Sequence, residues 1–381
     1  MLRKLWLLMK WLIIILVILI VLAYLFLRFA PTFGGQPDAK SQQKIEASKH
    51  FNGEVFKNLI ETKNDTSTAE SPSLASTLYQ LVYPPAEKNP TDILVTRALN
   101  LHQQPLQNGQ LVWLGHSSVL FRTDDLIIMT DPVFNRASPI PIGGKAFAMV
   151  HTPKIDDMPK IDVVIISHDH YDHLDYQAIQ DINEKVGHFY VPLGIKAHLQ
   201  RWGVSDAKIT EMDWYEEVRL KNTRLVFTPS RHFSGRKFER NRTLWGSWVV
   251  KSPNPSLYFS GDGGYSPEFA KIGEQFGPFD IALMEDGAYN QAWAQIHMFP
   301  EQSVQATLDL KAKAMLPIHW GKFDLALHEW RDPIERAQKA IADKPVTLTT
   351  PMIGEVFSIQ NLPQSEWWKS PYAPRESYQA N

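Results

Sequence analysis

Three histidines and an aspartate with metal-ligand spacing lie in one short loop, where residues 168–173 read HDHYDH. The apolar run at residues 163–166 precedes the loop, so a buried strand is expected to deliver these side chains to one point. Neutral imidazole and carboxylate are ligands that Zn²⁺ prefers. Two neighbouring ions accommodate four ligands from so tight a turn more easily than one ion, and two-metal sites favour hydrolysis. The alternative is a polar surface turn that happens to be rich in histidine.

Other chemically competent side chains follow further apolar runs. His232, Asp262 and His319 each stand where a strand is expected to end. Loops at strand ends hold functional groups over a rigid scaffold. Each residue alone is better explained as a turn cap, but together with the HDHYDH loop they supply enough ligands for two ions.

The motifs of this chain resemble those of the metallo-β-lactamase superfamily. The closest resemblance is to the branch of N-acyl phosphatidylethanolamine-hydrolysing phospholipases D and their bacterial relatives. It covers about residues 33 to 363, and its motifs stand in the family's order: WLGHS (113–117), TDP (130–132), ISHDHYDHLD (166–175), VPLG (191–194), FTPSRH (227–232), LWGSW (244–248), GDGGY (261–265) and IHWG (318–321). The resemblance implies an α/β fold, the αββα sandwich, where periodicity alone predicts only mixed α/β structure.

The resemblance also implies two Zn²⁺ ions per chain. Three residues hold each ion and Asp262 bridges them: His168, His170 and His232 for one, and Asp172, His173 and His319 for the other. A hydroxide shared by the ions is the implied nucleophile, because bound water loses its proton near neutral pH. Asp172 is expected to orient that hydroxide as well as to bind metal.

Three further residues are assigned supporting roles. His297 matches a family histidine near the substrate phosphate, which suggests a general acid or phosphate donor. A structural histidine at a helix entry is an equally good explanation for it. His116 and Asp131 resemble residues that support the ligands, and Asp131 is placed to accept the second N–H of a metal-bound histidine. The alternative for Asp131 is an ordinary Asp-Pro turn.

A cationic run lies beside His232, opposed only by Glu239: Arg231, Arg236, Lys237, Arg240 and Arg242. Such a run is usually a solvated face. Its position suggests instead that it attracts a phosphate or an anionic bilayer surface. We therefore predict that Arg231, Arg236, Lys237 and Arg240 bind substrate.

Composition limits the possible classes of protein. The 381 residues include 39 basic and 41 acidic side chains, so net charge gives no reason to expect a nucleic-acid partner. The chain has no cysteine, which excludes disulfides and thiolate metal sites and leaves histidine and aspartate as ligands. The absence of cysteine is compatible with an oxidising compartment.

The N-terminus contains an uncharged apolar run at residues 11–27, WLIIILVILIVLAYLFL. Together with residues 5–9 it approaches the ~20 residues that a bilayer requires. Arg3, Lys4 and Lys10 precede it, and the positive-inside rule then places the N-terminus in the cytoplasm and the catalytic domain outside it, in the periplasm or another extracytoplasmic space. The alternative is a cleaved signal peptide, although no A-x-A-like site follows.

Four segments are expected: an anchor at residues 1–30, a linker and extended arm at 31–90 with a helix near 73–81, a catalytic domain at 91–363, and a tail at 364–381. Helices are expected at residues 175–186, 267–276, 300–310 and 333–342, three of them beginning at proline. Strands are expected at residues 111–114, 119–123, 126–130, 163–167, 188–191, 225–228, 247–250, 257–260, 281–285 and 314–318. The tail either caps the domain, touches the bilayer or is disordered.

The resulting hypothesis is a membrane-anchored, binuclear-zinc hydrolase of phosphodiester bonds, with membrane phospholipids as substrate. The alternative is a hydrolase of the same fold with another substrate, such as a sugar-phosphate lactone. A non-catalytic lipid-binding protein is disfavoured because all seven ligands are present. The sequence indicates no oligomeric state.

Overall fold

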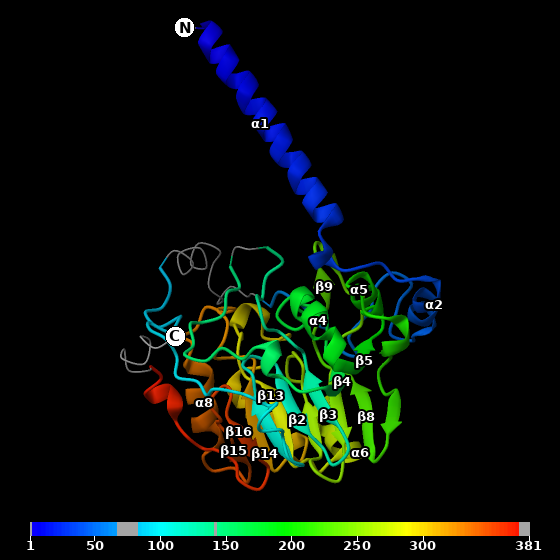
Figure 1. The fold of residues 1–381 in the computed structure, drawn as a ribbon, viewed down its shortest axis with the longest axis vertical. Coiled ribbons are helices and arrows are strands. Elements are labelled where there is room, and N and C mark those ends of the chain that lie inside the picture. The colour runs from blue at the N-terminus through cyan, green and yellow to red at the C-terminus, as the bar shows by residue number, and fades with distance from the viewer. Residues whose placement is uncertain (1, 67–82, 141–142, 373–381) are drawn as a thin grey trace.

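Two β-sheets packed face to face, with helices on both outer sides, form the body of the protein (Figure 1). The computed structural model describes residues 2–66, 83–140 and 143–372. The predicted αββα sandwich is confirmed. The helix expected near residues 73–81 lies outside the described residues.

The first sheet has seven strands. Its first three pairings, from β16 to β3, are antiparallel, and those from β3 to β6 are parallel. Its order is β16 (Val356–Ser358), β1 (Gln110–Trp113), β2 (Val119–Arg122), β3 (Ile127–Thr130), β4 (Ile161–Ile165), β5 (Val186–Pro192) and β6 (Ile209–Met212).

The second sheet also has seven strands, parallel from β15 to β12 and antiparallel from there to β7. Its order is β15 (Thr347–Leu348), β14 (Ala314–Ile318), β13 (Ile281–Glu285), β12 (Leu257–Phe259), β11 (Ser247–Lys251), β8 (Thr223–Thr228) and β7 (Glu217–Leu220). A separate small hairpin pairs β9 (Gly235–Arg236) with β10 (Glu239–Arg240).

Strand β4 illustrates how the sequence builds the layers. Successive side chains of a strand point to opposite faces. Val163 and Ile165 belong to the core between the sheets, whereas Val164 and Ile166 pack in the outer core beneath the helices. Because both faces are covered here, residues 163–166 are apolar without interruption, as is typical of buried parallel strands, and the exposed Asp162 lies near the start of β4.

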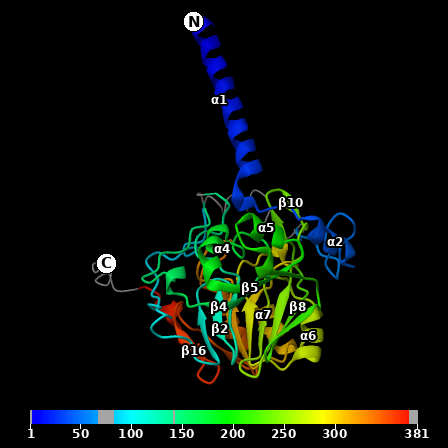
Figure 2. The same cartoon turned by 45° about the vertical axis from the view of Figure 1, so that its right-hand side comes forward.

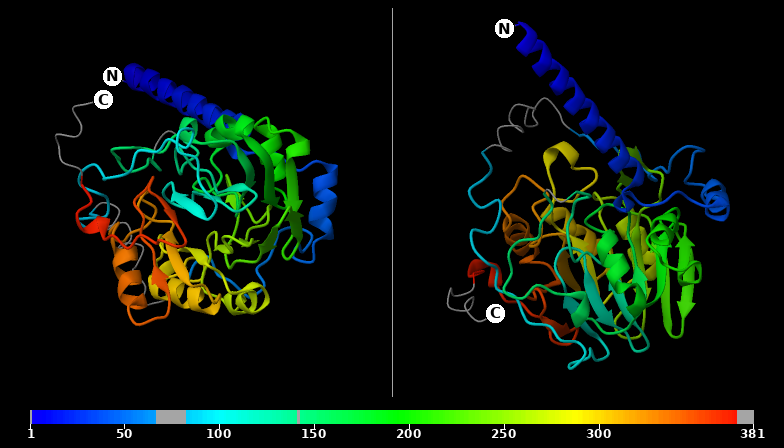
Figure 3. Two further views of the ribbon diagram at one scale, coloured as in Figure 1. Left: turned by 60° about the horizontal axis from the view of Figure 1, so that its bottom comes forward. Right: turned by 45° about the horizontal axis from the view of Figure 1, so that its top comes forward.

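Helices α4 (Tyr176–Ile182) and α5 (Lys196–Arg201) cover the first sheet, while α6 (Glu268–Phe276), α7 (Pro300–Asp309) and α8 (Asp332–Ile341) cover the second (Figures 1 and 3). The helices expected at 267–276, 300–310 and 333–342 are present within a residue at each end. The helix expected at 175–186 ends at Ile182 and continues as a short 3₁₀ turn. Asp175 caps its start by accepting hydrogen bonds from the backbone of Gln177 and Ala178.

The N-terminal helix α1 (Leu2–Phe29) stands away from the sandwich (Figures 1 and 2). Its stretch Arg3–Phe29 is long and apolar enough to cross a membrane and is not buried in the protein. The arm that follows was expected to be extended, but it contains α2 (Ala39–Ala47). Ser41 of α2 donates a hydrogen bond to Glu211 and Ile45 enters the core, so the arm is bound to the domain.

The described part of the C-terminal tail, up to residue 372, packs against the domain. Trp367 and Trp368 are buried, and the ring of Trp367 is stacked on Trp320 with centroids 5.4 Å apart. Of the three possibilities for the tail, these residues cap the domain.

Candidate metal centre

The seven predicted metal ligands come together at one edge of the sandwich. The carboxyl ends of parallel strands meet at the same edge of a sheet, and loops leave from there. Four strands contribute: β4 leads to His168, His170, Asp172 and His173, β8 to His232, β12 to Asp262, and β14 to His319.

The first ligand group consists of His168, His170, His232 and Asp262, whose ligand atoms lie within 4.8 Å of one another. Nδ1 of His170 is 2.8 Å from Nε2 of His168 and 3.3 Å from Nε2 of His232. Three ring nitrogens facing one point is the arrangement that a metal ion requires.

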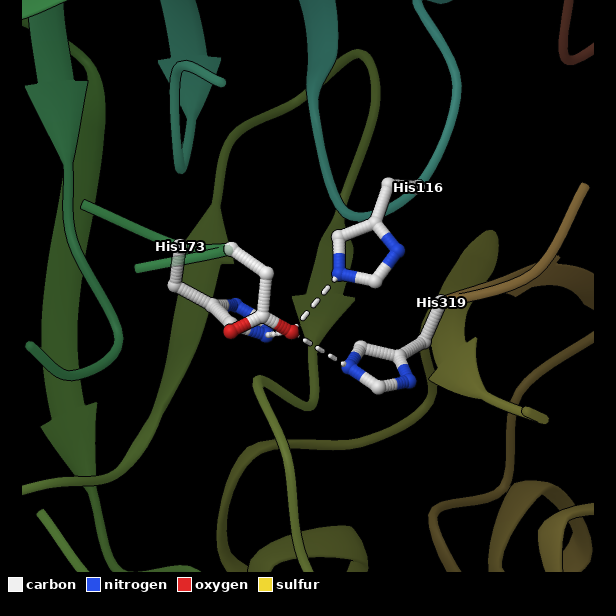
Figure 4. A group of neighbouring side chains, drawn as sticks. His116, His173 and His319 are labelled. Carbon is white, nitrogen blue, oxygen red and sulfur yellow. Dashed lines mark hydrogen bonds and ion pairs between the residues drawn. The ribbon is translucent and has the colours of Figure 1, made fainter. Parts of the chain in front are cut away.

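The second group brings together His116, Asp172, His173 and His319. Figure 4 shows the three labelled histidine rings turned toward one another. Oδ2 of Asp172 is 3.1 Å from Nε2 of His116, 3.3 Å from Nε2 of His319 and 3.4 Å from Nε2 of His173.

Asp262 links the two groups through one oxygen. Its Oδ2 atom is 3.1 Å from Nε2 of both His173 and His319, and 3.7 and 3.8 Å from Nε2 of His168 and His232. This is the geometry expected of a bridging carboxylate. The turn depends on Gly261, whose φ is +56° and where a Cβ atom would meet Gly246 O at 2.6 Å.

The chemistry of the donors fits divalent ions. Nε2 of His173 and Oδ1 of Asp262 are buried and have no hydrogen-bond partner among the described residues. A buried polar atom without a partner is costly, and coordination to a cation removes that cost. A set of imidazoles and carboxylates without thiolate suits Zn²⁺ and also suits iron.

The protonation states of the first group favour metal binding, whereas in the second group a metal ion must displace protons. There, against the effect of burial, Asp262 raises the pKa of His173 well above the usual value and the pKa of His319 to about 10. Burial lowers the pKa of His168 and His232 well below the usual value, which keeps these rings neutral. Burial opposes the ionised form of Asp262, but the adjacent His173 and His319 hold the pKa of Asp262 well below its usual value. Neutral imidazole and ionised carboxylate are the forms that coordinate metal.

The two residues expected to support the ligands are both adjacent to them. Nδ1 of His173 lies 2.7 Å from Oδ2 of Asp131, whose Oδ1 accepts the backbone N–H of Ser167 at 2.8 Å. His116 contacts Asp172, and burial lowers the pKa of His116 to about 3. The φ angles of His116 and Asp131 are +55° and +28°, a region that residues with a Cβ atom adopt uncommonly.

His297 borders both groups and has a buried partner that the sequence analysis missed. Its Nδ1 atom is hydrogen-bonded to Oε1 of Glu285, and Glu285 also accepts the backbone N–H of Gly263 at 2.6 Å. Burial raises the pKa of Glu285. Glu285 ends the apolar strand β13, and a charged residue at the end of a buried strand is the signal that could have revealed it.

The cationic residues beside His232 do not form one exposed patch. Arg236 is buried, and it donates hydrogen bonds to the backbone oxygens of Asp169 and Leu174, within or beside the HDHYDH loop, and of Thr32. Arg231 donates to Thr62 and to the backbone of Glu61 and Tyr265. These contacts hold the arm and the metal-binding loop in place.

A pocket of about 410 Å³ opens over the metal centre. Its floor includes ligands from both groups, and Arg240 and His297 stand on its walls. The remaining lining is largely apolar: Phe233, Ala288, Trp293, Ile296 and Leu325. Asn64 and Asp65 of the arm also border it, and no pattern in the sequence predicted their position.

Comparisons with known proteins agree with this geometry. A family model described as a beta-lactamase superfamily domain matches residues 127–320. An uncharacterized protein of Mycobacterium tuberculosis is 37% identical over 341 residues, 87% of this chain and 91% of that protein. The N-acyl-phosphatidylethanolamine-hydrolyzing phospholipase D 1 of Caenorhabditis elegans is 33% identical over 265 residues, 64% of this chain and 74% of that protein.

Solved structures share the fold at low sequence identity. A metallo hydrolase from Ignicoccus hospitalis superposes with a TM-score of 0.50 at 22% identity, covering 65% of this chain and 97% of that one. The diiron β-hydroxylase CmlA from Streptomyces venezuelae gives a TM-score of 0.51 at 18% identity, covering 67% and 55%. The fold is therefore compatible with more than one metal and more than one reaction.

Proposed function

This chain belongs to the beta-lactamase superfamily as a metal-dependent hydrolase, and we propose that it cleaves phosphodiester bonds of membrane phospholipids in the manner of a phospholipase D. The observation that carries this proposal is the position of Asp262. Its carboxylate joins two ligand groups at the floor of a largely apolar pocket. Sites for lipid-like ligands combine apolar walls with a few placed polar groups.

We propose that the two groups would hold two zinc ions, because the carboxylate of Asp262 adjoins both groups. Zn²⁺ held there would supply a water of lowered pKa and polarise the phosphoryl oxygen. His168, His170 and His232 surround one position, and Asp172, His173 and His319 the other. Asp172, whose pKa is held well below its usual value by His173 against the effect of burial, stays ionised and orients the attacking water.

His297 is the proposed general acid. Hydrolysis forms a bond between the water oxygen and phosphorus and breaks the bond to the headgroup oxygen, which must gain a proton. His297 lines the pocket beside the metal ligands, and its contact with Glu285 fixes Nδ1 and leaves Nε2 as the proton donor. Phosphatidic acid and the headgroup alcohol are the products.

The apolar helix α1 supports a lipid substrate. As an uncleaved anchor it would keep the pocket beside the bilayer and raise the effective concentration of phospholipid. Arg3, Lys4 and Lys10 favour a cytoplasmic N-terminus, which puts the catalytic domain on the opposite side of the membrane. The homologue from C. elegans is named for hydrolysis of an N-acylated phosphatidylethanolamine, which makes that lipid the first to test.

The test uses the full chain, loaded with zinc and reconstituted in nanodiscs that contain a panel of phospholipids. Mass spectrometry should detect phosphatidic acid together with the released headgroup, and Asp262→Asn should abolish both. Release of fatty acid would contradict cleavage at the phosphodiester. Inactivity on every phospholipid, with opening of a sugar-phosphate lactone, would establish the alternative substrate class.

A further inference from the structure

The tip of the β9–β10 hairpin carries an unusual side chain. Phe238 is 87% exposed, more than any other large hydrophobic residue in the described part of the chain, including those of α1. Lys237 precedes it and Glu239 follows it. An aromatic side chain beside a lysine at a loop tip is suited to the interface between water and lipid.

One side of the hairpin contacts the short segment that follows the C-terminal end of α1. Nε and Nη2 of Arg236 donate hydrogen bonds to the backbone oxygen of Thr32, at 3.0 and 2.6 Å. Nζ of Lys237 lies 5.5 Å from the ring centroid of Phe33. Thr32 and Phe33 follow the end of α1 by only a few residues, so the hairpin stands where the helix meets the domain (Figures 1 and 2).

The other side of the hairpin reaches the pocket over the metal centre. Arg240 lines that pocket together with Phe233, and its guanidinium carbon is 5.3 Å from the centroid of the Phe233 ring. The hairpin therefore spans the short distance between the anchor and the mouth of the pocket. A membrane that contains α1 would lie next to both.

The base of the hairpin is held firmly although its tip is free. Arg236 is buried and donates to the backbone oxygens of Asp169 and Leu174 at 2.7 and 3.0 Å. Its guanidinium carbon lies 4.2 Å from the ring centroid of Tyr171, and the backbone N–H of Lys237 donates to the Tyr171 hydroxyl. The tip thus projects from a base that is held against the metal-binding loop.

We propose that this hairpin tip docks on the surface of the bilayer that holds α1, with Phe238 inserted at the boundary between headgroups and acyl chains. Lys237 and Arg240 then face headgroup phosphates, and Glu239 remains in water. Docking turns the mouth of the pocket toward the lipid. The inference rests on the proposed membrane anchoring, and it extends the proposed function by naming how substrate enters.

The absence of cysteine allows a direct test. Phe238→Cys in the full chain can carry a single nitroxide label. The control is Val356→Cys, which is 38% exposed on β16, the edge strand of the first sheet opposite β6. In nanodiscs of phosphatidylcholine and phosphatidylglycerol, relaxation by oxygen and by an aqueous nickel chelate measures depth. The label at 238 should respond more to oxygen and the label at 356 more to nickel. Equal nickel accessibility at both positions would overturn the proposal.

The spin-label result does not depend on activity, so the two proposals can fail separately. If the label at 238 is shielded from nickel but the protein cleaves no phospholipid, the proposed substrate is refuted and the docking surface is retained. If the label at 238 is accessible to nickel and the protein does cleave phospholipid, docking alone is refuted. For an active protein, Phe238→Ser should raise KM for vesicles and leave KM for a short-chain soluble phospholipid unchanged. An equal rise for both substrates would contradict insertion.

Discussion

Nδ1 of His173 lies 2.7 Å from Oδ2 of Asp131, and both side chains are buried. This contact fixes the orientation of the ring and presents Nε2 to Asp172 and Asp262. Partners of this kind set ligand orientation and basicity, and their loss costs about 10- to 100-fold in metal affinity. We therefore expect Asp131→Asn to weaken zinc binding by that factor, measured by competition with a chromogenic chelator.

The control for this prediction is Asp162→Asn. Oδ2 of Asp162 accepts the backbone N–H of Ile127, so this carboxylate also joins β3 to β4, but at the ends of these strands remote from the metal centre. Its replacement should leave zinc affinity unchanged. Equal losses in the two variants would mean that Asp131 acts only through the packing of the strands.

The proposed bridging role of Asp262 predicts a different pattern from the proposed general-acid role of His297. Protein purified without chelator should contain close to two zinc ions per chain, and Asp262→Asn should lose most of that metal and nearly all activity. His297→Asn should keep its metal and lose about 10²- to 10⁴-fold in kcat, as expected for a general acid. Elemental analysis and steady-state kinetics measure both. Full metal content with near-normal turnover in Asp262→Asn, or iron in place of zinc in the wild type, would contradict the mechanism.

The candidate ligands could be identified in the sequence because their spacing is largely local. The HDHYDH loop places four donors within six residues, and each of the other candidate ligands stands within four residues of the end of an apolar strand. Likewise, the unbroken apolar character of Val163–Ile166 indicated a strand that is covered on both faces. Residue types, period and strand ends therefore indicated mixed α/β structure and the candidate ligands. The αββα sandwich and the division of the ligands between two ions came from the resemblance to the metallo-β-lactamase superfamily.

The roles of Arg236 and Glu285 could not be predicted from the sequence, because they depend on contacts between residues far apart in the chain. Arg236 looked like an exposed cation in a basic run, but its hydrogen bonds to Thr32 and Leu174 join segments far apart in the chain. Glu285 can orient His297 only because the fold places the end of β13 beside that ring. No local pattern reports which distant carbonyl or ring a side chain will meet.

The buried Lys322 should make the stability of the protein depend on pH in the alkaline range. Nζ of this buried lysine donates to the backbone oxygens of Leu114 and Val133, and burial lowers its pKa from 10.5 to about 8. Between these two pKa values the unfolded chain binds more protons than the folded one. The contribution of Lys322 to the free energy of unfolding therefore grows as pH rises from about 8 to 10.5, and it is lost as pH falls back to about 8. The full effect is about 3 kcal/mol, by the conversion of ~1.4 kcal/mol per pKa unit.

The measurement compares the wild type with Lys322→Met by urea unfolding at a series of pH values. The difference in the free energy of unfolding at each pH cancels the titration of the groups that both proteins share. Between pH about 8 and 10.5, the free energy of unfolding of the wild type should rise relative to that of Lys322→Met. Parallel curves would show that Lys322 is ionised normally in the folded protein.

The proposed orientation of the chain in the membrane rests on Arg3, Lys4 and Lys10, which precede most of the apolar part of α1. These charges should hold the N-terminus in the cytoplasm and place the residues after about Thr32 outside it. Protease added to intact spheroplasts should then digest the catalytic domain. Protection until lysis would place the domain on the cytoplasmic side, and a mature protein that begins after residue 30 would identify a signal peptide instead of an anchor.

Two arginines of the same hairpin should respond differently to the same change of charge. Arg240 stands at the pocket mouth, and one cation near an anionic surface is worth about 1 kcal/mol, or about five-fold in binding. Arg240→Gln should raise KM for anionic vesicles by about that factor, weaken its dependence on salt and leave kcat nearly unchanged, because uniform binding is removed.

Arg236→Gln should behave differently because the Arg236 guanidinium is buried against the backbone oxygens of Asp169, Leu174 and Thr32. Removing it leaves buried acceptors without partners and loosens the metal-binding loop, so this variant should lose thermal stability and bound zinc. Its KM should keep the salt dependence of the wild type, since the lost charge does not face the substrate. Kinetics on vesicles at low and high salt, with zinc content measured in parallel, separate the two effects. If Arg236→Gln weakens the salt dependence as much as Arg240→Gln does, the hairpin attracts lipid through both arginines and the structural role of Arg236 is wrong.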